Sequence, residues 1–194
     1  MRPLPFVVFL FVAVLLLALA CESGGDGTPS GGATSPTAGA TIPPADIAAL
    51  KEYFLAIETI SKEDRERGTA LRAELEAALS AATTEDEKIK ALRGRIEGTA
   101  TILEDDLDGV NNIDPPAGAK DAHNSFVNAL AEQLAVFRLL LDASTGAQSV
   151  TEWDAVSAQF ASAATEADEG VLDACSELQD IADSSGIDVD LGCE

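Results

Sequence analysis

Residues 84–116, TEDEKIKALRGRIEGTATILEDDLDGVNNIDPP, contain the signals that decide the fold. Thr84 followed by Glu87 has the pattern of a capping box, which marks the first turn of a helix. Large apolar residues then recur at helical steps of three, four and seven: Ile89, Leu92, Ile96, Leu103, Leu107 and Val110. The final NNIDPP ends this helix, because the residue before a proline is pushed out of the helical region. We expect Asp114 to cap the next helix, with Pro115 in its first turn.

The same helical period appears in three other segments. The first begins after Pro44, the third ends at Gly146, and the fourth has a second capping box at Ser149 and Glu152 and ends before Gly186. Their apolar positions are Ile47, Leu50, Phe54, Ile57, Leu71, Leu75 and Ala78; then Val127, Leu130, Leu134, Phe137 and Leu141; then Trp153, Val156, Phe160, Ala163, Ala167, Gly170, Ala174, Leu178 and Ile181. No stretch alternates in the manner of a strand, so the sequence predicts an all-α fold.

Short connections between long helices force neighbours in sequence to run antiparallel. The sequence therefore predicts that residues 45–194 form one domain, an antiparallel up-down-up-down four-helix bundle. Both ends of this domain and the turn at residues 115–116 should lie at one end of the bundle. The loops at residues 81–84 and 145–149 should lie at the other.

Residues 61–69 interrupt the apolar seam of the first helix. The helical period places Ser61, Asp64 and Gly68 on the core side, so either the helix breaks there or the bundle has a polar middle. The fourth segment is unusually small at the corresponding level, with Ala163, Ala164, Ala167 and Gly170. These small residues either allow close helix packing or leave a groove, and we favour close packing because protein interiors rarely keep voids.

An apolar run at the N-terminus, residues 4–21, follows Arg2 and ends on a cysteine. A positive residue followed by a short apolar run is typical of a secretory signal peptide. A spanning helix needs about 20 apolar residues, so the run is at the lower limit for a permanent anchor. The alternatives are an ordinary signal peptide and a marginal membrane helix, each with an incidental cysteine.

The end of this run, Leu17-Ala18-Leu19-Ala20-Cys21, resembles the lipobox of bacterial lipoproteins. The resemblance implies that residues 1–20 are a signal peptide cut before Cys21, and that Cys21 carries a lipid. Residues 115–130, with Pro115-Pro116, several alanines, His123 and Phe126-Val127, also resemble segments of unclassified bacterial lipoproteins with helical ectodomains. This resemblance identifies no activity. Residues 22–44 are rich in Gly, Ser, Thr, Ala and Pro and should form a disordered tether. We therefore expect a lipid-anchored protein on the outer side of the cell membrane.

A lipid on Cys21 leaves two of the three cysteines, Cys175 and Cys193, as an even pair. An exported compartment permits a disulfide between them, and such a bond would hold the C-terminal tail. The alternative is two free buried thiols. The chain has no Cys-x-x-Cys motif, which argues against a redox enzyme and a structural zinc site.

The chain carries 12 basic and 34 acidic residues, a formal net charge of −22. Such a surface repels phosphate backbones and anionic lipid headgroups, so we expect no nucleic acid partner. The membrane should be a partner through the N-terminal lipid alone. The sequence identifies no protein or small-molecule partner.

The residue inventory argues against the cofactors that helical bundles often hold. The chain has one histidine, His123, and its one methionine is Met1, so di-iron and haem ligand sets are incomplete. We expect no cofactor, and we expect His123 to be a packed side chain rather than a ligand.

Residues 104–114 form an acidic cluster in which Asp106, Asp108 and Gly109 match part of a calcium loop. Pro115 stands where that loop needs its bidentate glutamate. Asp106 and Asp108 are therefore a weak cation candidate, with three interpretations: a specific calcium site, weak condensation of cations, or a solvated helix end. The last is favoured, because the apolar period continues through the cluster.

These features predict a non-catalytic binding or structural module at the cell surface. One alternative is a solute- or cation-binding lipoprotein with a polar cavity within the bundle, beside Asp64, Gly68 and the small residues of the fourth segment. Another is an enzyme, which would require two buried carboxylates facing one cavity. No catalytic residue can be named from the sequence.

Overall fold

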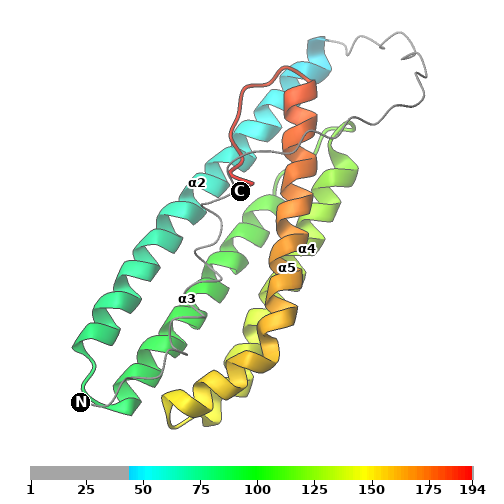
Figure 1. Cartoon of the computed structure of the whole chain (residues 1–194). Helices are drawn as coiled ribbons and strands as arrows, with labels where there is room; N and C mark the ends of the chain where they lie inside the picture. The colour runs from blue at the N-terminus through cyan, green and yellow to red at the C-terminus, as the bar shows by residue number, and fades with distance from the viewer. Residues whose placement is uncertain (1–43, 194) are drawn as a thin grey trace, which may run out of the picture. The chain divides into compact units, whose positions relative to one another are not determined.

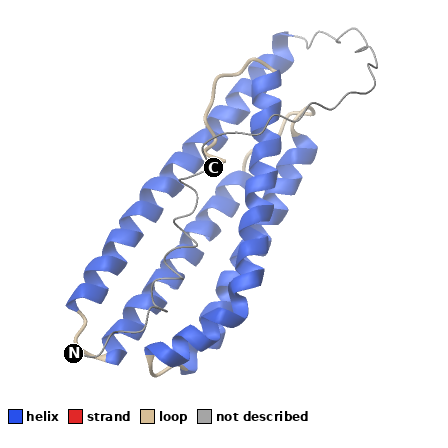
Figure 2. Cartoon of the chain, viewed as in Figure 1, coloured by secondary structure: helices blue, strands red, loops and turns tan. Residues whose placement is uncertain are grey.

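The computed structural model describes residues 44–193, in which four long helices account for most of the chain (Figure 2). They are α2 (Pro44–Ala81), α3 (Glu85–Asn111), α4 (Lys120–Ala143) and α5 (Val150–Ser184), with a 3-10 turn, η2 (Ser144–Gly146), after α4. No strand occurs within these 150 residues, so the predicted all-α fold is confirmed. The predictions for the signal peptide, for Cys21 and for the tether up to residue 43 lie outside the described residues.

Consecutive helices pack side by side and antiparallel, as the predicted up-down bundle requires (Figure 1). One end, called the tail end below, contains the start of α2, residues 112–119 and the end of α5. The other, called the loop end, contains residues 82–84 and 144–149. The first and last helices, α2 and α5, make far fewer contacts with each other than consecutive helices do. The bundle is therefore open between them over much of its length.

The first helix continues through its polar segment without a break. Residues 61–69, SKEDRERGT, include Lys, Glu and Arg, which have good helix propensity, and no proline. Ser61, Asp64 and Gly68 are half-buried. Of the two interpretations of this segment, the polar middle is the one that the structure has.

The connection from α3 to α4 differs from the prediction. Asp114 does not cap a helix: α4 begins at Lys120, and its N-cap residue, Ala119, makes no side-chain capping bond. Pro116 disfavours the helical conformation at Pro115, the residue before it. The helix therefore begins further along the chain. Instead the Ala119 N–H donates to the Pro116 carbonyl at 2.9 Å, in a turn that leads into α4.

The other helix ends follow the local signals closely. Thr84 forms the full predicted capping box with Glu87. Ser149 accepts from the Glu152 N–H at 3.2 Å, but the Glu152 carboxylate accepts from the Gln148 N–H at 2.7 Å instead of completing the box. The third segment is helical to Ala143 and ends in η2 rather than as one helix to Gly146.

Most of the apolar core lies in the half of the bundle toward the tail end. Its members come from the first half of α2, the second halves of α3 and α5, most of α4, and the tail. The large side chains that are less than 2% exposed are Phe54, Ile57, Val110, Leu178 and Leu191. The second half of α2, by contrast, contains no fully buried residue.

The C-terminal tail, residues 185–193, turns back after α5 and runs along the bundle (Figure 1). Gly186 permits the turn because its φ of 68° lies in the left-handed region, which favours glycine. Cys193 then reaches Cys175 on α5, with the two Cα atoms 5.4 Å apart and the sulfur atoms bonded. The predicted disulfide-clasped tail is confirmed.

Candidate functional site

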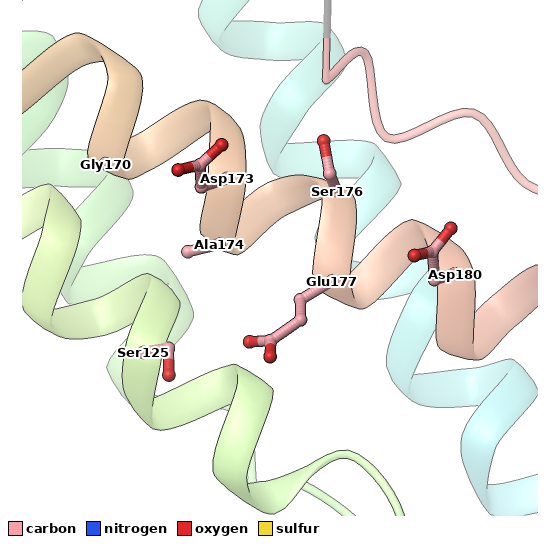
Figure 3. A pocket seen from close by; sticks show the side chains of 7 residues that line it. All are labelled: Ser125, Gly170, Asp173, Ala174, Ser176, Glu177 and Asp180. Atoms are coloured by element: carbon pink, nitrogen blue, oxygen red, sulfur yellow. The ribbon is translucent and has the colours of Figure 1, made fainter. Parts of the chain in front are cut away.

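A shallow groove of about 460 Å³ lies between α4 and α5 (Figure 3). Ser125 lines it from α4, and Glu177 extends from α5 toward α4 beside it. The remaining lining residues, all on α5, are Gly170, Asp173, Ala174, Ser176 and Asp180. The polar members are exposed to solvent, so the groove is a surface feature rather than an interior cavity.

The charge of this groove is wholly acidic. α5 carries nine Asp and Glu residues and no Lys or Arg. A surface with one sign of charge attracts mobile ions of the opposite sign, so the groove favours cationic groups. It contains no histidine, cysteine or lysine that could act as a nucleophile.

The small residues of α5 only partly form the predicted close contact. Ala167 is buried, but Ala163 is exposed and Gly170 lines the groove, with no atom within 4 Å of the position where a Cβ would stand. α5 packs chiefly on α4 rather than opposite the polar middle of α2. At this interface the Gln133 side chain donates to Asp168 at 2.6 Å, and burial raises the pKa of Asp168.

A second polar cluster lies between α2 and α3, where the carboxyl groups of Asp64 and Asp106 lie close enough to affect each other's titration. Two carboxyl groups can hydrogen-bond to each other only when one of them is protonated. Asp106 is 8% exposed, and burial followed by the charge of Asp64 raises its pKa to about 7. Burial also raises the pKa of Asp64. Asp106 therefore keeps its proton to a higher pH than an exposed aspartate does, and when protonated it can donate a hydrogen bond to Asp64.

Two close contacts between α2 and α3, one on each side of the carboxyl pair along the helices, fix the position of this pair. A Cβ on Gly98 would stand 2.7 Å from Leu71, and one on Gly109 would stand 3.1 Å from Ile60. Each pair brings α2 close to α3, and the two contacts lie eleven residues apart on both helices, as antiparallel packing requires. The carboxyl pair lies between these contacts.

Arginines surround the carboxyl pair. Arg67 donates to the neighbouring Asp105 at 2.6 Å, and its charge and that of Arg65 act to lower the pKa of Asp64. Burial lowers the pKa of Arg95, which the charge of Asp64 partly opposes. The buried Nη1 atom of Arg95 has no hydrogen-bond partner within residues 44–193. The cluster thus combines two carboxyl groups of raised pKa with nearby positive charge.

The two residues of the weak cation candidate do not lie on the same side of the helix. Asp106 and Asp108 are both in continuous α3, but Asp106 is buried and Asp108 is exposed. Two residues two positions apart do not face the same direction on a helix. Within residues 44–193, no group of three or more His, Cys, Asp or Glu side chains is arranged to hold a metal ion.

His123 is packed, as the sequence indicates. It is 5% exposed, and its Nδ1 atom lies 3.1 Å from the Tyr53 hydroxyl in α2. Burial lowers the pKa of His123, although the charge of Asp114 opposes this, and burial raises the pKa of Tyr53 above its ordinary value. The Tyr53–His123 contact joins α2 to α4 within the core.

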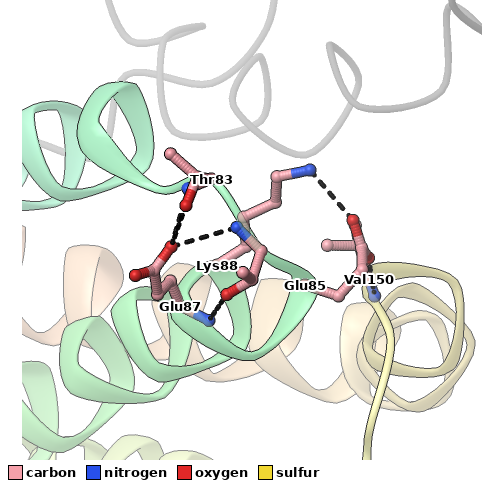
Figure 4. Close-up of polar contacts among 6 residues, drawn as sticks. Thr83, Glu85, Glu87, Lys88 and Val150 are labelled. Carbon is pink, nitrogen blue, oxygen red and sulfur yellow. Dashed lines mark hydrogen bonds and ion pairs between the residues drawn. The ribbon is translucent and has the colours of Figure 1, made fainter.

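Polar contacts tie the two connections at the loop end to each other (Figure 4). The Glu85 carboxylate accepts from the Val150 N–H at 3.0 Å and from Lys88 at 2.9 Å. Arg93 donates to the Ser144 carbonyl at 3.0 Å. Hydrogen bonds from Thr83 and then Thr84 lower the pKa of Glu87 to about 2. These contacts hold the two connections together at the loop end.

The carboxyl pair was partly visible in the sequence. The helical period places Asp64 on the core side of α2, but the partner of Asp64 depends on how α2 is aligned with α3. Of the two carboxyl groups, Asp106 is buried and Asp64 is half-buried, and the groove is lined by α4 and α5 instead. The structure therefore does not bring the pair and the groove together into one site.

Comparison with known proteins gives no relative for this chain: no protein family, no curated protein and no solved structure matches it. Among the described residues, no helix combines the length and the apolar character that crossing a membrane would need.

Proposed function

We propose that the protein is a lipid-anchored extracytoplasmic helical module with a non-catalytic binding or structural role at the cell surface. The observation that carries this proposal is the pairing of Cys175 with Cys193. Disulfides persist in oxidising compartments outside the cytoplasm, which agrees with the N-terminal apolar run. The pair also uses two of the three cysteines and leaves Cys21 for the lipid.

A non-catalytic role is supported by the separation of the polar groups. The carboxyl group with the most strongly raised pKa, Asp106, lies between α2 and α3, whereas the groove lies between α4 and α5. An acid–base enzyme needs its titrating groups in the cleft that holds the substrate. The acidic groove residues instead suit electrostatic contact with a cationic group.

Metabolic labelling with palmitate tests the anchor. We expect label on the full-length chain, loss of the label in Cys21→Ala, and accumulation of the uncut precursor when globomycin is added. Cys193→Ala is the matched control, because it removes a cysteine but keeps the lipobox, and it should retain the label. Label that persists in Cys21→Ala would refute the assignment.

A second candidate is the binding of a cationic solute, for which the α4–α5 groove offers both space and charge. Titration calorimetry with calcium measures this directly. Heat at millimolar metal that disappears in the double variant Asp173→Asn/Glu177→Gln would support it. The absence of heat, together with an unchanged melting temperature, would rule calcium out.

A further inference from the structure

The C-terminal tail contacts both α2 and α5, the two helices that barely contact each other. On the α2 side, the Asp190 N–H donates to Glu58 at 3.2 Å. On the α5 side, Gln179 accepts from the Leu191 N–H at 3.0 Å and donates to the Val189 carbonyl at 3.0 Å. The tail therefore bridges the open side of the bundle at the tail end.

Apolar side chains of the tail complete the core beneath this bridge. Ile187 is 4% exposed and Leu191 is 1% exposed, and both belong to the same cluster as Phe54 of α2 and Leu178 of α5. Release of the tail would expose this cluster between α2 and α5. The α3 and α4 helices would keep their own contacts with their neighbours.

The end of the tail follows a path that suits only glycine. Gly192 has a φ of 69°, and the Arg65 guanidinium of α2 occupies the place where a Cβ would stand. This arrangement brings the next residue, Cys193, to Cys175. The disulfide is the covalent hold on this segment. Its other contacts are three hydrogen bonds to two side chains, the bond from the Ile187 N–H to the Ala182 carbonyl, and two buried apolar residues.

We propose that this tail is a redox-controlled strap: cleavage of the Cys175–Cys193 disulfide by a dithiol reductant releases residues 187–193 and opens the bundle between α2 and α5. Cys175 is 6% exposed and Cys193 is half-buried, so Cys193 is the more accessible residue of the two. This proposal does not depend on the lipid anchor.

The dithiol reductant supplies the electrons and protons for this thiol–disulfide exchange. One thiolate of the dithiol attacks the Cys193 sulfur, the disulfide bond breaks, and Cys175 leaves with the electron pair and takes up a proton. The second thiol of the reductant attacks the mixed disulfide and releases Cys193 as a thiol. Two electrons and two protons pass to the protein, and the reductant becomes a disulfide.

Hydrogen exchange on the full chain, with and without dithiothreitol, tests the strap. We expect the amides of Asp190 and Leu191 to exchange roughly tenfold faster or more after reduction, because their side-chain acceptors no longer hold them. The amides of Leu130 and Leu134 in α4 should keep their protection, and reoxidation should restore that of the tail. Unchanged exchange in the tail, or loss of protection in all helices, would overturn the proposal.

Two variants separate the disulfide from other effects of the reductant. Cys193→Ser should show fast tail exchange without dithiothreitol, and the reductant should not change it further. Cys21→Ser keeps the tail disulfide and should respond to dithiothreitol as the unmodified chain does. A tail in Cys193→Ser that stays as protected as in the oxidised protein would contradict the strap.

Discussion

At the scale of single residues, the buried carboxyl group of Asp106 makes folding sensitive to pH. In the unfolded chain an aspartate has a pKa near 3.9, whereas burial raises that of Asp106 to about 7 in the folded state. The folded protein therefore binds a proton that the unfolded chain has lost between these pH values. Its contribution to stability is fully present below about pH 4 and is lost as the pH rises through about 7.

Asp106→Asn keeps the shape of the side chain and removes its titration. We expect the variant to be more stable than the unmodified protein at pH 8, by about 1–3 kcal/mol, and the advantage to shrink toward pH 5. Urea unfolding at both pH values measures this difference. The variant and the unmodified protein are compared at the same pH. The titration of buried His123, which changes stability with pH in the opposite direction, therefore affects both equally.

Asp105→Asn is the matched control, since Asp105 is the exposed neighbour of Asp106 and its side chain pairs with Arg67. It should show no comparable gain at pH 8. An Asp106→Asn effect that is the same at pH 5 and pH 8 would mean that the pKa of Asp106 is not raised in the folded protein.

At the scale of the helices, the accurate predictions depend on residues close in sequence. The capping box at Thr84, the end of α5 before Gly186 and the apolar periods all involve contacts within about one turn, so the local sequence is sufficient. The start of α4 was predicted wrongly because two prolines in a row act on each other. Pro116 restrains Pro115 and delays the helix to Lys120.

The sites depend on contacts that the local sequence does not specify. The pairing of Asp64 with Asp106 requires the particular alignment of α2 and α3 that Gly98 and Gly109 permit. Likewise, Gly170 lines a groove because α5 packs on α4 rather than on α2. In both cases the sequence shows the residue type but does not show which residue of another helix lies next to it.

Removal of the α3 cap tests the local account of the helices. Thr84→Ala leaves the Glu87 N–H without its side-chain acceptor, so we expect a loss of about 1 kcal/mol in the free energy of unfolding. Urea denaturation measures the loss. Thr101→Ala, at an exposed position within α3, should not destabilise the protein. Equal effects of the two substitutions would show that the capping bond contributes nothing.

At the scale of the whole molecule, charge is distributed unevenly. The chain has a net charge of −22, and α5 contributes nine acidic residues without one basic residue. Repulsion among like charges destabilises a compact state, and acidic residues near the C-terminus of a helix also oppose its dipole. Stability should therefore rise as salt screens these charges.

Asp180→Asn removes one charge from α5 near its C-terminus. We expect it to stabilise the protein by about 0.3–1 kcal/mol at low ionic strength, with the gain diminishing in 1 M sodium chloride. Thermal unfolding in the two salt concentrations measures the effect. Ser176→Ala changes a neutral residue of the same groove and should show no salt-dependent gain. A gain in Asp180→Asn that persists in high salt would rule out charge as the cause.

The position of the core toward the tail end also determines where the sequence can change. Truncation of Phe54 or Leu178 leaves a void in the packed half, a change that typically costs about 2–5 kcal/mol. At the loop end, the connection through residues 145–148 crosses a mostly exposed surface, where extra residues displace little apolar packing. Insertions should therefore accumulate at that connection, and new recognition surfaces could arise there without a change of fold.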